Sequence, residues 1–167
     1  MGLLTYLSIA NFLITRSMAR IALFPGSFDP FTKGHEDIVR RGLRLFDEVV
    51  IGIGVNSRKE RYFSLPQMTA WIEGTFAHEP AVRVVTYDDL TANVARELGA
   101  RFLLRGLRNT TDFEYENGIS QVNRYVYQEV ETVFLITSPH LAPISSSIIR
   151  DLHRYGQPVN DFLPYQL

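Results

Sequence analysis

Hydrophobic positions along the chain follow two alternating patterns. Short runs rich in Val, Ile, Leu and Phe are typical of buried parallel strands, and the stretches between them carry apolar residues at helical spacing. The runs predict five strands, at residues 21–24, 48–55, 82–85, 102–104 and 133–136. The amphipathic stretches predict helices at 36–46, 64 to about 77, 91–98, 112 to about 128 and 146–155. The tail, 161–167, is expected to pack locally.

Strands that alternate with helices predict an α/β fold, with a five-stranded parallel sheet and helices on both faces. In such sheets ligands bind beyond the carboxyl ends of the strands, where the strand order switches. The 167 residues suffice for one well-packed domain, and the sequence has no internal repeat or linker. Residues 19–167 are therefore predicted to form a single domain.

The first 18 residues differ from the rest of the chain. Their apolar stretch is interrupted and shorter than the ~20 residues that span a bilayer, and it lacks a basic leader and a clean cleavage site. Met18 directly precedes the first predicted strand. Residues 1–18 are interpreted as an extension outside the fold, either dispensable or the product of a start assigned too far upstream. The alternative is an apolar N-terminus that acts at a membrane.

Composition narrows the class of protein. The net charge of −1 provides no overall field that would attract nucleic acid or an anionic membrane. The absence of Cys excludes disulfides, thiolate metal sites and a Cys nucleophile, and the four His residues lack zinc-like spacing. The expectation is a cytoplasmic, soluble enzyme without a nucleic-acid or membrane partner.

The stretch from 20 to 35, RIALFPGSFDPFTKGH, predicts a strand, a turn and the start of a helix. Pro25 and Gly26 are expected to end strand pairing, and Ser27 follows with a small hydroxyl group. A strand–turn–helix unit of this kind directs backbone N–H groups and a positive helix end at one point, where an anion fits. His35 adds a donor of adjustable charge there, although a His at a helix start is often only a capping residue.

Cationic and hydroxyl side chains follow the other predicted strands. Arg105 and Arg108 flank a glycine in a predicted loop, where two guanidinium groups can hold different phosphates. Lys59 lies in the loop after the second strand, and three serines at 145–147 precede the last helix, with Arg150 one turn further on. If these strand ends converge, they form a basic, hydroxyl-rich rim. The alternatives are a solvated arginine pair, a surface lysine and serines that only cap the helix.

Acidic residues open the helix that begins at 112. They stabilise the helix dipole, and Glu116 can instead meet a ligand hydroxyl, an amine or a basic side chain. The neighbouring Phe113 and Tyr115 are interpreted as packing residues rather than as a base-stacking platform.

Motifs across the chain resemble those of a known family. Thr32-Lys33-Gly34-His35 resembles the Thr-x-Gly-His signature of the nucleotidylyltransferase superfamily. PGSFDPFTKGH, the Lys59 loop, RGLRNTTDFEYE, Asn123-Arg124 and ISSSIIR extend the resemblance to the phosphopantetheine adenylyltransferase family, from residue 19 to about 163. The resemblance implies a Rossmann-like, cytoplasmic homohexamer of coenzyme A biosynthesis. It also implies transfer of the adenylyl group of ATP to 4′-phosphopantetheine, giving dephospho-coenzyme A and pyrophosphate, with Mg²⁺ carried by ATP rather than by protein ligands.

The resemblance also implies roles for individual residues. His35 is the implied transition-state stabiliser, with Ser27, Lys59 and Arg108 as further catalytic residues. The implied 4′-phosphopantetheine ligands are Ser27, Lys59, Thr91 and Arg105. The implied ATP ligands are Ser27, Phe28, His35, Gly106, Leu107, Arg108, Glu116, Leu141, Ala142, Pro143, Ile144, Ser145, Ser146 and Ser147. The acceptor phosphate is itself a nucleophile, so direct in-line attack without a covalent enzyme intermediate is expected.

The sequence departs from the family pattern at a few positions. Ser27 stands where many relatives have Thr, and Pro66 and Gln67 replace an acidic pair. The short C-terminal tail leaves some oligomer contacts open. Sister enzymes that share Thr32 to His35, a nicotinate-mononucleotide adenylyltransferase or a cytidylyltransferase, remain alternatives. A non-catalytic nucleotide-binding module is another.

Overall fold

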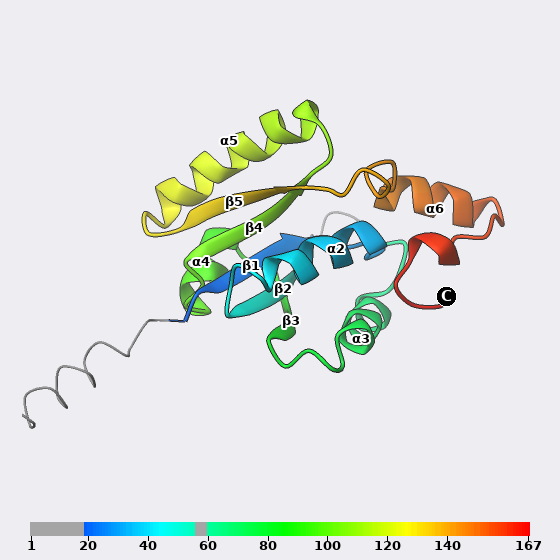
Figure 1. Cartoon of the computed structure of the whole chain (residues 1–167), viewed down its shortest axis with the longest axis horizontal. Helices are drawn as coiled ribbons and strands as arrows, with labels where there is room; N and C mark the ends of the chain where they lie inside the picture. The colour runs from blue at the N-terminus through cyan, green and yellow to red at the C-terminus, as the bar shows by residue number, and fades with distance from the viewer. Residues whose placement is uncertain (1–18, 56–59) are drawn as a thin grey trace, which may run out of the picture.

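The computed structural model describes residues 19–55 and 60–167 and places a five-stranded parallel sheet at the centre of this part of the chain. The strand order is β3-β2-β1-β4-β5 (Figure 1). The strands are β1 (Ile21–Gly26), β2 (Glu48–Gly54), β3 (Val82–Tyr87), β4 (Phe102–Leu107) and β5 (Glu131–Ile136). The helices are α2 (Lys33–Gly42), α3 (Leu65–Thr75), α4 (Thr91–Glu97), α5 (Thr110–Val126) and α6 (Ser146–Arg154), followed by the 3₁₀ helix η1 (Asn160–Phe162).

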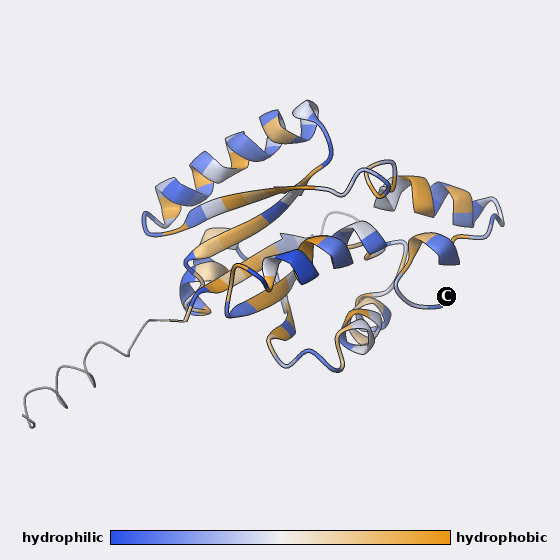
Figure 2. Ribbon diagram, in the orientation of Figure 1, coloured by the Kyte–Doolittle hydropathy of each residue, from blue (hydrophilic) through white to orange (hydrophobic). Residues whose placement is uncertain are grey.

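Alternation along the strands produces two hydrophobic cores, one on each face of the sheet. Ala22 and Phe24 of β1 point into a core with residues of α2 and α3, whereas Leu23 between them points into a core with α4. Long apolar stretches accordingly follow the strands, whereas the helices alternate between apolar and polar residues (Figure 2). The predicted α/β fold, with a Rossmann-like parallel sheet and helices on both faces, is confirmed.

The strand order switches beside β1. The chain adds β2 and then β3 on one side of β1, and it returns to place β4 and β5 on the other side. The carboxyl ends of β1 and β4 therefore lie at the point where the two halves of the sheet diverge. This is where ligands bind in open α/β sheets.

The prediction that Pro25 and Gly26 end strand pairing was wrong. Both belong to β1 and lie opposite Gly52 and Ile53 of β2. The ladder between β1 and β4 includes only two residue pairs and ends at Leu23. Pro25, which lacks an N–H group, is therefore accommodated in a central strand because the chain has already separated from β4 at that point.

The interpretation of Arg105 and Gly106 as loop residues was also wrong. Both lie within β4, opposite Phe134 and Leu135 of β5, because the pairing with β5 continues to Leu107. Arg105 is thus carried by a strand inside the sheet, and Arg108 is the first residue beyond it.

Two helices begin earlier than predicted, because a side chain caps each one. Thr32 caps α2, so Gly34 and His35 lie inside its first turn. Asn109 caps α5 and accepts the N–H of Asp112. Within residues 19–55 and 60–167, no helix has the length and apolar character needed to cross a membrane. The interpretation of residues 1–18 concerns a segment outside the described residues.

Candidate active site

A cavity of about 320 Å³ opens at the carboxyl ends of β1 and β4. Residues 24–28 of β1 and the following turn form one wall, and residues 105 and 106 of β4 form another. The first turn of α2 and the serines at the start of α6 close it. The cavity therefore gathers segments more than a hundred residues apart in the sequence, as the converging strand ends predicted. We refer to it as the first cavity.

His35 lies in the first turn of α2 and lines the first cavity. Its Nδ1 lies 3.0 Å from the backbone nitrogen of Thr32 and accepts that N–H, while Thr32 Oγ1 accepts the N–H of His35. The two residues thus form a reciprocal capping box in which an imidazole takes the place of the usual Glu or Gln. Because Nδ1 is engaged, Nε2 is the ring nitrogen that remains for a ligand.

The imidazole of His35 is held in its neutral form. Burial, and to a smaller extent the positive charges of Arg105 and Arg108, together lower its pKa from 6.5 to about 3. Three aromatic rings surround it, with Phe28 edge-on at 5.1 Å between ring centres and Phe24 and Phe31 slightly further away. A neutral imidazole with an accepting Nδ1 carries its proton on Nε2. His35 therefore presents a neutral N–H donor to a ligand.

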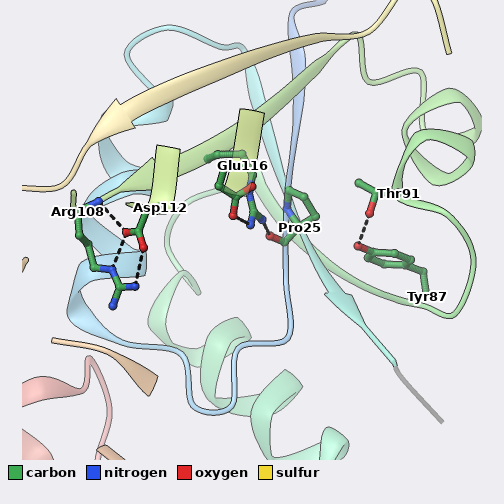
Figure 3. A network of polar contacts seen from close by, with 7 residues as sticks. Pro25, Tyr87, Thr91, Arg108, Asp112 and Glu116 are labelled. Atoms are coloured by element: carbon green, nitrogen blue, oxygen red, sulfur yellow. Dashed lines mark hydrogen bonds and ion pairs between the residues drawn. The ribbon is translucent and has the colours of Figure 1, made fainter. Parts of the chain in front are cut away.

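Arg105 and Glu116 form a forked ion pair between β4 and α5. Arg105 Nε donates to Glu116 Oε2 at 2.7 Å, Nη2 donates to Oε1, and Nη1 donates to the carbonyl oxygen of Pro25 (Figure 3). The side chains of Arg105 and Glu116 are only 23% and 10% exposed. Of the roles left open for Glu116, the contact observed is with a basic side chain.

Arg108 pairs with Asp112 across one turn at the start of α5 (Figure 3). The guanidinium donates to both carboxylate oxygens, at 2.9 and 3.0 Å, and the backbone N–H of Arg108 donates to the same carboxylate. These hydrogen bonds lower the pKa of Asp112 and raise that of Arg108. Both arginines for which phosphate binding is predicted are therefore already oriented by carboxylates in this structure.

The serines at the start of α6 combine the two roles that the sequence left open. Ser145 is the N-cap and accepts the N–H of Ile148 at 3.2 Å, and Ser146 donates its hydroxyl to the carbonyl of Pro30 at 2.8 Å. All three serines line the first cavity. The N-terminus of α6 and that of α2 therefore both face the cavity with their positive ends.

A second cavity, also of about 320 Å³, adjoins the first. The two share Pro25, Gly26, Ser27, Arg105 and Glu116. The second cavity extends between the end of β3 and α5, and Thr91 lines it as the start of α4. Tyr87 lies beside Thr91, and their hydroxyl oxygens are 3.0 Å apart (Figure 3). Ser27, Arg105 and Thr91 are thus brought to one place, as the predicted acceptor site requires.

Some predicted site residues do not line either cavity. Leu107 is buried in the sheet, and Leu141, Ala142 and Pro143 lie in the connection before Ile144, which does line the first cavity. Lys59 lies outside the described residues. Tyr115, interpreted as a packing residue, is 70% exposed, whereas Phe113 packs edge-on against Phe134.

Sequence reasoning missed several residues that line the cavities. Thr137 follows β5, and Asp88 and Asp89 follow β3, so their positions at strand ends could have identified them. Ser120 and Asn123 follow Glu116 at helical spacing and face the second cavity from α5. Asn123 belongs to a motif that carried the family resemblance, but no site role was predicted for it. No side-chain pattern distinguished Ile38, which lines the first cavity from α2.

No group of three or more His, Cys, Asp or Glu side chains suited to a metal ion occurs among residues 19–55 and 60–167. The two carboxylates that line the first cavity, Asp112 and Glu116, each pair with an arginine. These carboxylates therefore do not form a shared cation cage.

The model of the cytidylyltransferase-like family matches residues 23–152, which include every wall of both cavities. The phosphopantetheine adenylyltransferase of Cytophaga hutchinsonii is 61% identical over 150 residues, which is 90% of this chain and 100% of that protein. This chain belongs to the phosphopantetheine adenylyltransferase family. The Flavobacterium johnsoniae member of the family is 52% identical over 145 residues, 87% of this chain and 95% of that protein.

A solved structure shares the fold at low sequence identity. A bifunctional NMN adenylyltransferase/ADP ribose pyrophosphatase from Francisella tularensis superposes with a TM-score of 0.67 at 16% identity. The match covers 89% of this chain and 46% of that one, so this chain spans about half of its length. The likeness shows the shared fold, whereas the adenylyltransferase family rests on the much higher identities above.

Proposed function

We propose that this protein transfers the adenylyl group of ATP to the phosphate of 4′-phosphopantetheine, giving dephospho-coenzyme A and pyrophosphate. The observation that carries the proposal is that two neighbouring cavities share Ser27, Arg105 and Glu116 in their walls. Two phosphorylated substrates can meet there, with cationic side chains and two helix N-termini around them. The family to which the chain belongs takes its name from this activity.

ATP is assigned to the first cavity, where His35, Arg108 and the serines at 145–147 surround its phosphates. In this assignment Phe28, Glu116 and the segments 106–107 and 141–144 complete the ATP site. 4′-Phosphopantetheine is assigned to the second cavity with Thr91, and its phosphate is held at the junction by Ser27, Arg105 and Lys59. Support comes from the lining of the cavities, since Ser27 and Arg105 belong to both.

The proposed reaction is a direct in-line displacement. An oxygen of the acceptor phosphate attacks the α-phosphorus of ATP, and the bond from that phosphorus to the bridging oxygen breaks as the new bond forms. The electron pair of the broken bond leaves with pyrophosphate. Since the acceptor is already an anion, no side chain needs to be activated as a nucleophile and no covalent enzyme intermediate forms.

The neutral imidazole of His35 is suited to the proposed transition state. Its Nε2–H donates to a non-bridging oxygen of the α-phosphate, where negative charge increases during the displacement. The Ser27 hydroxyl and the N-terminus of α2 face the same group. Arg108 and the start of α6 stabilise the departing pyrophosphate. Arg105 holds the acceptor in line, which lowers the entropic barrier of a reaction between two bound molecules.

Magnesium is proposed to enter as part of the MgATP substrate. When bound to the phosphates, the ion neutralises part of the charge on the leaving group. The pairing of Asp112 and Glu116 with arginines supports a metal held by the nucleotide rather than by a carboxylate cage.

The protein is further proposed to act as a cytoplasmic homo-oligomer, a hexamer by family resemblance, whose single catalytic domain is formed by residues 19–167. Tyr115, Val122 and Tyr125 are exposed along α5, and Tyr125 is 88% exposed. Apolar side chains at this helical spacing support contacts between subunits. Light scattering during size-exclusion chromatography measures the oligomer mass directly.

The deciding experiment measures pyrophosphate release from ATP, Mg²⁺ and 4′-phosphopantetheine. Release is expected only when all three are present, and nicotinate mononucleotide should not replace the acceptor. The contrary results are ATP binding without pyrophosphate release, which indicates a binding module, and a preference for another acceptor or for CTP, which indicates a sister enzyme.

A further inference from the structure

Two short segments on the outer side of the first cavity bind each other reciprocally. Arg61 Nη2 donates to the backbone oxygens of Ser27 and Phe28, at 2.7 and 3.2 Å. In the opposite direction, the carboxylate of Asp29 accepts the backbone N–H groups of Tyr62 and Phe63, at 2.8 and 2.9 Å. Residues 27–29 and 61–63 are therefore joined by charge-assisted hydrogen bonds of both polarities.

The Asp29 half of this arrangement is well protected. Asp29 is buried, and its two carboxylate oxygens each accept one of the N–H groups. Arg150 of α6 donates to its backbone oxygen. Since the residues after Arg61 are anchored in this way, Arg61 itself is kept next to the turn at Ser27.

The two carbonyl groups that Arg61 binds belong to site residues. Ser27 lines both cavities, and Phe28 lines the first. Phe28 has φ of 43°, in the left-handed region, which a bulky L-residue rarely adopts. Its ring lies edge-on to the imidazole of His35.

The Phe28 ring also occupies space that only a glycine leaves open. A Cβ at Gly26 would lie 2.7 Å from two of its ring carbons. The unusual backbone conformation of Phe28 therefore determines where its ring meets His35. A contact that stabilises this conformation also stabilises the position of the imidazole.

We propose that Arg61 is a positioning residue for the adenylyl transfer proposed above, on which this inference rests. By binding both carbonyl oxygens, it holds Phe28 in the left-handed conformation and keeps Ser27 at the junction of the cavities. The hydroxyl of Ser27 and the ring of His35 are then in place before the substrates bind. Arg61 lines neither cavity, so it acts through the turn and not by touching a substrate.

A second way in which Arg61 could help is through its charge alone, by attracting phosphates to the rim. A lysine at this position would preserve the role that depends on charge alone, but not the positioning role. Arg61→Lys keeps the positive charge but loses the fork with which one guanidinium nitrogen reaches two carbonyl groups while Nε binds Phe63 O at 3.3 Å. Arg61→Gln removes both the charge and the fork.

The test compares Arg61→Lys and Arg61→Gln with Arg96→Gln. Arg96 is a matched control, because it also donates to a distant carbonyl, that of Val126 at 2.5 Å, and lines neither cavity. We expect both Arg61 variants to lose about 10- to 100-fold in kcat, the size of effect that a displaced reacting group causes. Their melting temperatures should fall no more than that of the control, whose kcat should stay unchanged.

The outcomes separate this inference from the proposed function. With an active wild type, unchanged kcat in both Arg61 variants overturns the positioning role, and so does full activity of Arg61→Lys beside a defective Arg61→Gln. An inactive wild type overturns the proposed function instead. In that case the crystal structure of Arg61→Lys decides: Phe28 should leave the left-handed region, and an unchanged φ with Ser27 in place overturns the role.

Discussion

The Nδ1 atom of His35 accepts the backbone N–H of Thr32 across 3.0 Å, and Thr32 Oγ1 accepts the N–H of His35 in return. One motif thus provides acceptors for two N–H groups at the start of α2 and determines which ring nitrogen carries the proton. In glutamate capping boxes the second partner is only an acceptor, whereas here it also provides a donor on its far side. Helix capping and the orientation of the proposed catalytic group are therefore the same interaction.

The first prediction concerns the protonation of His35. Between pH 6.5 and about pH 3, the imidazole should stay neutral in the folded protein, with its proton on Nε2, because burial, Arg105 and Arg108 lower its pKa. Long-range ¹H–¹⁵N NMR of the imidazole nitrogens reports both the charge and the tautomer. In urea-denatured protein the same residue should titrate near 6.5. A cationic His35 ring in folded protein at pH values just below 6.5 would contradict the prediction.

The lowered pKa has a consequence for stability. Between pH 6.5 and about pH 3, the unfolded chain binds a proton at His35 that the folded chain does not. The contribution of His35 to the free energy of unfolding is therefore complete above pH 6.5 and decreases as the pH falls through this range. Urea unfolding of the wild type and of His35→Asn over the same pH values isolates the effect, and parallel pH profiles would refute it.

The second prediction concerns catalysis by His35. Replacement by Ala should lower kcat by about 10²- to 10³-fold, the usual cost of removing one donor to a developing charge. The fold should persist, with a loss of about 1 kcal/mol from the missing cap. Steady-state pyrophosphate release and circular dichroism measure the two effects. Turnover close to that of the wild type would exclude His35 as the transition-state donor.

The third prediction concerns the ion pair of Arg105 and Glu116. Glu116→Ala leaves a largely buried guanidinium without its carboxylate, so the free energy of unfolding should fall by about 3 kcal/mol. Glu131→Ala is the control, because Glu131 and its partner Arg124 are 59% and 61% exposed and such pairs contribute about 0–1 kcal/mol. Denaturant unfolding measures the free energy of unfolding of both variants. Equal losses would contradict the prediction that the buried pair contributes more than the exposed pair.

The fourth prediction concerns the packing of α2, the helix that carries His35. A Cβ at Gly42 would lie 2.7 Å from Leu104 Cδ2 of β4, so Gly42→Ala should cost about 1–3 kcal/mol and displace the helix. In α3, Gly74 has no neighbouring atom within 4 Å of an added Cβ. Gly74→Ala should therefore stabilise the protein by about 0.5–1 kcal/mol. Thermal unfolding distinguishes the pair by the sign of the change.

The fifth prediction concerns the second cavity. Tyr87→Phe removes the hydroxyl that lies 3.0 Å from Thr91 Oγ1, while the ring that covers Gly52 and Gly54 remains. If this cavity holds the acceptor, the KM for 4′-phosphopantetheine should rise about 5-fold, the equivalent of one neutral hydrogen bond. The KM for ATP should not change. An effect on ATP alone would reverse the assignment of the two cavities.

The conformation of α2 shows how far the sequence could predict the site. Thr32, Gly34 and His35 form a local motif, and the cap that joins Thr32 to His35 spans one helical turn. The amphipathic spacing of Ile38 and Val39 placed the helix against the sheet, and both residues are buried there. Phe46, which the predicted helix included, is also buried but lies beyond the helix, which ends at Gly42. Interactions of this range depend on residues only a few positions apart, so the sequence pattern contains them.

The position of Arg105 shows where local pattern was insufficient. A glycine between two arginines favoured a loop, but Arg105 and Gly106 are strand residues because β5 pairs with β4 along its whole length. The same long-range pairing brings Glu116 to Arg105 and encloses the second cavity with α5. In both cases, β4 with β5 and Arg105 with Glu116, the two partners belong to different elements, so a local sequence pattern does not contain the contact.

The sequence by itself determined the alternation of strands and helices, the turn that precedes α2 and the residue types that phosphate chemistry needs, since each depends on neighbouring positions. Only the tertiary structure decided the strand order β3-β2-β1-β4-β5, the pairing of Arg105 with Glu116 and the place of Ser27 in the walls of two cavities. Those features arise when segments far apart in the chain compete for partners, and the choice among partners is made by the packing of the whole domain.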